Sequence, residues 1–151
     1  MSESGAYKSK TIAAWLALLL GGFGVHRLYL YGTNDKLAWL HPIPMMLGIY
    51  GLQRMDALGQ DDRLAWVLLP LLGLMLSQAM LCAIVYGLSK DARWDAQHNA
   101  GRSGRPSGWG AVVAAVAALM IGGVALMSTI AFSAQRYFEF QAATSAAENS
   151  R

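Results

Sequence analysis

The sequence is poor in charge: only 14% of its 151 residues are Asp, Glu, Lys or Arg, whereas soluble domains average about 25%. Hydrophobic residues make up 55% of the chain, and they gather in long uncharged runs. This composition excludes an ordinary soluble domain. We therefore expect an all-α integral membrane protein, folded as one small helical bundle.

The sequence has little cysteine, and it also lacks the residue patterns typical of metal sites and of nucleophilic catalysis. Cys82 is the only cysteine, so no intrachain disulfide forms, and its apolar surroundings indicate a small buried residue rather than a reactive thiol. The histidines His26, His41 and His98 do not recur at helical spacing, so we expect no metal site and no cofactor. No Gly-x-Ser-x-Gly or comparable nucleophile motif occurs, and we expect no catalytic residues and no enzyme.

The charges that remain also limit the partners. The formal net charge of +3 is spread over loops and tails rather than over one basic stripe, which argues against nucleic acid. Basic loops of this kind set orientation in a membrane or touch anionic lipid. We expect membrane lipid as one partner and a membrane protein, either another chain or a second copy, as the other.

The first uncharged run covers residues 11–25 and, continued to Tyr31, predicts a helix about 31 Å long. That length crosses a hydrocarbon core of about 30 Å. Lys8 and Lys10 before it resemble the basic region of a signal peptide, but no Ala-x-Ala-like cleavage site follows. We expect a retained first helix with Thr11 as its N-cap.

The second run, residues 37–53, contains Pro42 and Pro44 near its start. We expect the helix proper to begin near Pro44 and to end before Arg54, which gives about 18 Å of helix. That is too short to cross the membrane cleanly. The segment is either a tilted span or a re-entrant helix packed against the Gly21–Gly24 face, and a polar loop is expected over 56–63.

Two further runs, residues 64–89 and 109–134, are each twenty-six residues long and uncharged. Ser77 and Gln78 lie near the middle of the first, where we expect hydrogen bonds to a neighbouring helix. The basic segment 90–108, rich in Gly and Ser, is expected to be a flexible loop. The prediction is three long spans plus one short proline-broken helix, hence three or four transmembrane segments. It divides the chain into a tail 1–10, a helical pair 11–58, a second pair 59–134 and a fraying tail 135–151.

Small residues recur every four positions in three of these runs, which lets helices approach closely in a membrane. These ridges predict packing of the helices on one another or on a partner. They consist of Ala13, Ala17 and Gly21; Ala79, Ala83 and Gly87; and Ala114, Ala118 and Gly122.

The first run ends in Gly-Gly-Phe-Gly-Val-His-Arg-Leu-Tyr-Leu, residues 21–30. This stretch resembles the hallmark Gly-Gly-x-Gly-x-His-Arg-Phe-Tyr-Leu-Gly of the two-transmembrane-helix (TM-two) domain family. The resemblance covers about residues 8–56 and carries over Gly21, Gly22, Gly24, His26, Arg27, Tyr29 and Leu30. Leu28 replaces the family's Phe, and Tyr31 replaces its last Gly.

The resemblance implies a two-helix membrane core and no agreed enzymatic activity. It also implies an aspartate near the end of the second helix, where Arg54 occupies the expected position and Asp56 follows two residues later. The last two predicted spans lie outside the resemblance, so the chain would be an extended version of the family's pair.

His26 and Arg27 are charged or polar groups where hydrocarbon should be ending, and three interpretations stay open. Arg27 could reach lipid headgroups with Tyr29 and Tyr31 as interfacial anchors, or it could form a polar site with His26 that pairs with Asp56 or an anion. The third interpretation is contact with a protein partner.

From these features we expect a non-enzymatic accessory, assembly or scaffold component of a bacterial inner membrane, with several spans. The alternatives are a pathway for a small solute, ion or proton through the His26 and Arg27 site, and a lipid-binding or lipid-modifying protein. With four spans the basic residues divide six against six, so orientation stays open.

Overall fold

The computed structural model describes residues 6–99, 102, 104 and 106–149. The described residues form eight helical elements, which confirms the expected all-α class. They are α1 (Lys10–Leu20), a 3₁₀ turn η1 (Gly21–Phe23), α2 (Val25–Tyr31), α3 (Lys36–Leu40), α4 (Pro42–Leu58), α5 (Arg63–Leu88), α6 (Asp91–His98) and α7 (Trp109–Asn149). Expectations for residues 1–5, 100–101, 103, 105 and 150–151 lie outside these ranges.

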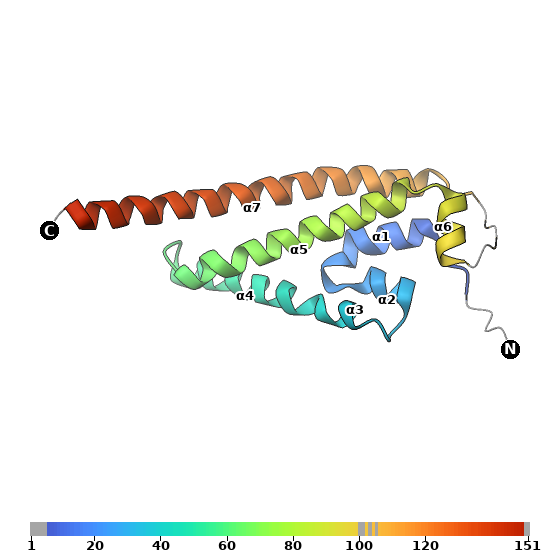
Figure 1. The fold of residues 1–151 in the computed structure, drawn as a ribbon, viewed down its shortest axis with the longest axis horizontal. Coiled ribbons are helices and arrows are strands. Elements are labelled where there is room, and N and C mark those ends of the chain that lie inside the picture. Colours follow the sequence, from blue (N-terminus) through green and yellow to red (C-terminus); the bar gives the residue numbers. More distant parts are fainter. Residues whose placement is uncertain (1–5, 100–101, 103, 105, 150–151) are drawn as a thin grey trace.

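Three long elements run side by side: α4, α5 and α7 (Figure 1). The α7 helix packs along α5, and α4 packs on the opposite side of α5. The short helices α1, α2 and α6 gather at one end of this bundle, which we call the N-terminal end. The α4–α5 connection lies at the other end, and α7 continues past it.

Two helices, α5 and α7, are long and apolar enough to cross a membrane. This agrees with a helical membrane protein. The shorter apolar segment Lys10–Phe23 does not reach that length.

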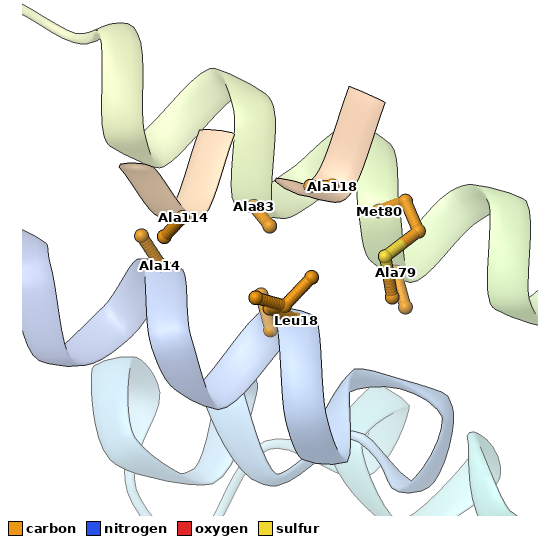
Figure 2. Close-up of a cluster of buried hydrophobic side chains, with 8 residues drawn as sticks. Ala14, Leu18, Ala79, Met80, Ala83, Ala114 and Ala118 are labelled. Carbon is orange, nitrogen blue, oxygen red and sulfur yellow. The ribbon is translucent and has the colours of Figure 1, made fainter. Parts of the chain in front are cut away.

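The core is built from alanine, which explains how closely the helices approach. Side chains from α1, α5 and α7 meet in one cluster (Figure 2). Its buried members are Ala14, Ala17, Leu18, Ala79, Met80, Ala83, Ala114 and Ala118. Because an alanine projects only one methyl group, three helix backbones come near one another over this patch.

The expected helix from Thr11 to Tyr31 is not continuous. It begins at Lys10, after Ser9 as N-cap, and α1 ends at Leu20. The chain then reverses through η1, and Gly24 adopts the left-handed conformation with φ of 75°. An L side chain is strained there, which is why glycine serves at the turn.

After the reversal, α2 returns beside α1, and the two helices form a hairpin. The backbone N–H of Ser9 donates to the hydroxyl of Tyr29 at 2.8 Å, and Lys8 Nζ donates to the carbonyl oxygen of Leu30. Residues twenty positions apart therefore meet at the open end of the hairpin. A single straight helix would hold them about 30 Å apart.

The second run forms a longer helix than expected. The α4 helix begins at Pro42 instead of Pro44 and continues through Arg54 to Leu58, so the loop expected over 56–63 starts at Gly59. The prolines do not break it because they lie in its first turn, where no backbone N–H is needed for the ladder. Only the single turn at His41 separates it from α3.

Two segments expected to be irregular are helical. Within 90–108, the eight residues of α6 form a helix whose Trp94 is buried. The α7 helix continues through the expected tail as far as Asn149. The Ala, Gln and Glu residues of that tail are strong helix formers, so the helix extends beyond its apolar part.

Candidate functional site

At the three glycines of the motif, the hairpin closely approaches the neighbouring helices. A Cβ atom added to Gly21 would lie 2.6 Å from Ala79 Cβ on α5, and one added to Gly22 would lie 2.9 Å from Met45 Sδ on α4. At Gly24 it would lie 2.7 Å from the carbonyl oxygen of Ala38 on α3. Each missing side chain thus corresponds to a contact with a different helix.

His26 lies inside this contact region and is fully buried. Its ring centroid is 5.9 Å from that of His41, nearly perpendicular to it, and 5.9 Å from the ring of Tyr86. Within the described part of the chain, neither ring nitrogen of His26 has a hydrogen-bond partner. His26 is therefore a polar group enclosed by three helices.

Arg27 points to the surface turn rather than to α4. Its Nε donates to Asp35 Oδ2 at 2.8 Å, and its guanidinium lies 5.2 Å from the centroid of the Tyr31 ring. The hydrogen bond from Arg27 lowers the pKa of Asp35. Asp56, which was one possible partner for this site, is exposed in the last turn of α4, at the other end of that helix.

Tyr29 does not act as an outward anchor in this structure. Its hydroxyl accepts from the backbone N–H of Ser9, so the side chain closes the hairpin instead. Tyr31 is about half exposed, and its ring contacts that of His98 on α6 at 6.1 Å. The two tyrosines therefore tie α2 to α1 and to α6.

A second polar cluster covers the open end of the hairpin, and we call it the polar cap: Tyr7, Lys8, Lys10, Asp91, Trp94, Asp95 and Asn99. In it, Trp94 Nε1 donates to the carbonyl oxygen of Lys8 at 2.8 Å, and Lys10 Nζ pairs with Asp91 Oδ1 at 2.8 Å. Asp95 accepts from Tyr7 and Asn99. An open pocket of about 720 Å³ lies between the cap, the start of α1 and residues 106–108, which precede α7.

Two carboxyl groups of the polar cap have shifted pKa values. The hydrogen bond from Lys10 is the main cause that lowers the pKa of Asp91, and the backbone N–H of Gly104 is the main cause that lowers the pKa of Asp95. Both residues are therefore ionised at neutral pH, and each holds two distant segments of the chain together.

The ridge residues lie inside the molecule. Ala17, Ala79, Ala83, Ala114 and Ala118 belong to the shared core, whereas Ala13 packs with Leu30 and Trp94.

The remaining ridge positions are glycines at close approaches. A Cβ added to Gly87 would lie 2.5 Å from the carbonyl oxygen of Ala111, and one added to Gly122 would lie 2.7 Å from Met80 Cβ. The ridge faces therefore contact other helices of the same chain, and a partner would have to use another surface.

Ser77 and Gln78 were expected to form hydrogen bonds to a neighbouring helix, but their observed contacts lie within α5. Ser77 Oγ donates to the carbonyl oxygen of Gly73 at 2.7 Å, and Gln78 Nε2 lies 3.6 Å from Cys82 Sγ, both within α5. Ser77 is thus satisfied within its own helix at four-residue spacing, whereas Gln78 Oε1 is buried without a hydrogen-bond partner among the described residues.

Sequence reasoning missed the polar cap and the pairing of His26 with His41. Both depend on contacts between segments far apart in the chain. The α6 helix gave only a weak signal, because a helix of eight residues with Ala92, Trp94 and Ala96 as its apolar members lacks a clear apolar stripe. The usable clues were Trp94, an aromatic residue in an otherwise polar stretch, and the two histidines on either side of the turn at Gly32.

The fold and this site define a small all-α protein with helices able to cross a membrane. Within it, residues 6–52, the segment that holds α1, α2, α3 and the first part of α4, match the family model of the TM2 domain. The apolar helices α5 and α7 follow C-terminal to the match. No curated protein and no solved structure gives a significant match to the chain.

Proposed function

We propose that the chain is a non-enzymatic accessory, assembly or scaffold protein that acts through helix packing in a bacterial inner membrane. The observation that carries this proposal is the outward face of α7. One side of α7 packs on α5 and α1, while apolar side chains along the other side are exposed. A heptad-like stripe runs along that side: Val113, Val116, Met120, Gly123, Met127 and Ile130.

A second copy of the chain is the occupant that this stripe fits. Spacings of three and four residues let two helices pack along a shared seam, and the stripe carries no charge. At Gly123 nothing lies within 4 Å of an added Cβ, so a second backbone could approach closely there. Two identical stripes related by a two-fold axis would form a self-complementary interface.

Crosslinking through introduced cysteines tests this pairing, in a Cys82→Ser background. Val116→Cys on α7 and Val85→Cys on α5 are matched, because both are valines with 54% exposure. We expect oxidative crosslinking in native membranes to give dimers at Val116 and few at Val85. Equal yields at both positions, or crosslinks at Val116 only to other proteins, would overturn self-association through α7.

The arrangement also supports a topology in which α3 and α4 together, α5 and α7 make three crossings. The α1–α2 hairpin would then enter and leave on one side, because Gly21 at its tip meets Ala79, about 14 Å from the end of α5. Helices that reverse within a membrane are tolerated when protein covers them, as α5, α4 and α3 do here.

Three crossings give a charge asymmetry that four do not. Of the described basic residues, seven belong to the N-terminal end, namely Lys8, Lys10, Arg27, Lys36, Lys90, Arg93 and Arg102, and three to the other end, namely Arg54, Arg63 and Arg136. The positive-inside rule then puts the N-terminal end in the cytoplasm.

Labelling tests the orientation. A cysteine at Asn34, next to Lys36, should react with a membrane-impermeant thiol reagent only after the membrane is opened. One at Gln60, in the α4–α5 connection, should react in intact cells. The reverse pattern would invert the proposed orientation, and labelling of both positions from one side would mean that α3 and α4 do not cross.

A pathway for a small solute, ion or proton is a second candidate, favoured by the fully buried His26 at a helix hairpin. Reconstituted liposomes test it with a pH-sensitive dye inside. Proton flux above empty vesicles that disappears in His26→Phe would support the pathway, and flux equal to empty vesicles would exclude a proton route.

A further inference from the structure

The ring nitrogens of His26 have no hydrogen-bond partner among the described protein atoms. A neutral imidazole carries one N–H donor and one nitrogen lone pair, and burial removes both from bulk water. Here the ring is fully buried and neither nitrogen has a protein partner among the described residues. Buried polar groups of this kind are normally satisfied by protein or by an ordered water.

The neighbouring ring of His41 has an acceptor nitrogen without a donor among the described residues. Its Nδ1 lies 2.8 Å from the carbonyl oxygen of Leu37, and a carbonyl only accepts, so Nδ1 carries the hydrogen. The lone pair of the neutral ring is therefore on Nε2. That nitrogen is buried and also lacks a partner in the described part of the chain.

Among the described residues, the groups that border the two rings supply no hydrogen-bond partner to these nitrogens. Arg27 is engaged by Asp35, and the Tyr86 ring approaches His26 at a tilt of 51°. Gly21 and Gly24 border the pair: an added Cβ would lie 3.6 Å from His26 Nδ1 at the first and 3.2 Å from His41 Cγ at the second. Because these two glycines have no side chain, they place no additional atoms next to either ring.

We propose that His26 and His41 together form a binding site for a water molecule at the tip of the hairpin. A water can accept from the N–H of His26 and donate to Nε2 of His41 at the same time, which a backbone carbonyl cannot do. The ring centroids are 5.9 Å apart, and the two rings make no direct hydrogen bond to each other.

The site gives the Gly-Gly-x-Gly-x-His stretch a specific role. The water would link α2 to the turn between α3 and α4 through hydrogen bonds, without a charged pair inside the bundle. The inference does not depend on self-association through α7 or on a solute pathway.

Magic-angle-spinning NMR of ¹⁵N-histidine and ¹⁵N-tryptophan protein in lipid bilayers tests the proposal. We expect magnetisation from water to reach the His26 ring at least several times faster than it reaches Trp94 Nε1. Trp94 is the matched control, because it is also buried but donates directly to a protein carbonyl. His41→Phe should slow the transfer to His26 to the Trp94 rate.

Three results would overturn the site. One is transfer to His26 no faster than to Trp94, and another is a direct hydrogen-bond coupling between the two rings. The third is a set of ring ¹⁵N shifts that changes on treatment with a chelator, which would indicate a metal ion in place of water. The unsubstituted protein decides the question even if His41→Phe does not fold.

Discussion

The α1–α2 hairpin and the α4 helix use the same small residue in opposite ways. In the hairpin, Gly24 takes a left-handed conformation and the helix reverses. In α4, Gly48 and Gly51 remain helical and let α5 approach, since added Cβ atoms would each lie 2.5 Å from Cβ atoms of Leu72 and Leu68. The difference shows that a glycine in an apolar run marks a close contact as readily as a break.

Proline shows the same contrast in reverse. Pro42 and Pro44 suggested a broken segment and a short helix. In the structure they begin α4, which is longer than predicted. The run with no proline among residues 11–31 is the one that breaks. Position within a helix, rather than residue type, decides the outcome, because a first-turn proline costs no hydrogen bond.

The largest effect is expected at Gly24, compared with Gly32. Both have positive φ, 75° and 78°, but only Gly24 is crowded. Gly24→Ala adds a clash with Ala38 to the strain of the left-handed backbone and should lower the free energy of unfolding by about 2–5 kcal/mol.

The matched variant separates the two causes. Gly32→Ala, where nothing lies within 4 Å of the added Cβ, should cost only the strain, about 1–2 kcal/mol. Denaturant unfolding of each variant in mixed micelles measures both values. Equal losses would mean that the hairpin is not packed against α3 as described.

A smaller effect is expected in α4. Gly48→Ala puts a methyl group 2.5 Å from Leu72 Cβ and 2.6 Å from the Leu72 backbone nitrogen, so α4 and α5 must separate, at a cost of about 1–3 kcal/mol. In the monomeric protein, Gly123→Ala in α7 has open space and should be neutral or stabilising by up to about 1 kcal/mol. Thermal unfolding in micelles distinguishes them, and a harmless Gly48→Ala would contradict the close α4–α5 contact.

These sites show what the sequence could predict. Uncharged length predicted α5 and α7, because twenty or more apolar residues have few other ways to be buried. The hairpin was not predictable from the run 11–31, since its apolar content fits one long helix as well as two short ones. The turn at Gly24 is selected by contacts with α3, which lies later in the chain.

The candidate site also has a part that the sequence could predict and a part that depends on distant contacts. The motif identified His26 and Arg27 by their position at the end of an apolar run. It could not identify Asp35 as the partner of Arg27. In the structure, Asp35 accepts both from Arg27 and, as the N-cap of α3, from the Leu37 backbone N–H. Side-chain pairs of this kind become visible only once the direction of each helix is known.

The polar cap and the alanine core should respond differently to pH. The folded-state pKa values of Asp91 and Asp95 are lowered, so their stabilisation is present above the unfolded value of about 3.9 and is lost as pH falls through the folded values. We expect the melting temperature to fall below about pH 4. The alanine core carries no titratable group in its buried set.

The double variant Asp91→Asn and Asp95→Asn isolates the cap. It should melt at a lower temperature than the original protein at pH 7, and its melting temperature should change less between pH 6 and pH 3. Calorimetry in micelles over that range gives the comparison. An unchanged pH slope would mean that the cap does not hold the hairpin closed.

The smallest effect is expected from the two ion pairs that close the α2–α3 and α4–α5 connections. Arg27 Nε donates to Asp35 Oδ2 at 2.8 Å, and Arg54 Nε donates to Asp62 Oδ2 at 2.7 Å, each across eight residues. In both pairs the aspartate is also the N-cap of the next helix. Asparagine caps a helix about as well as aspartate, so Asp→Asn removes the charge and keeps the cap.

Asp35→Asn and Asp62→Asn should therefore lower the melting temperature only slightly, and 1 M salt should remove most of the difference. Asp62→Ala should cost more than Asp35→Ala, because Asp62 caps the twenty-six residues of α5, whereas Asp35 caps the five residues of α3. Equal losses for the two alanine variants would show that the cap acts on the turn alone. A larger loss at Asp35 would show that the hairpin, rather than α5, depends more on its connection.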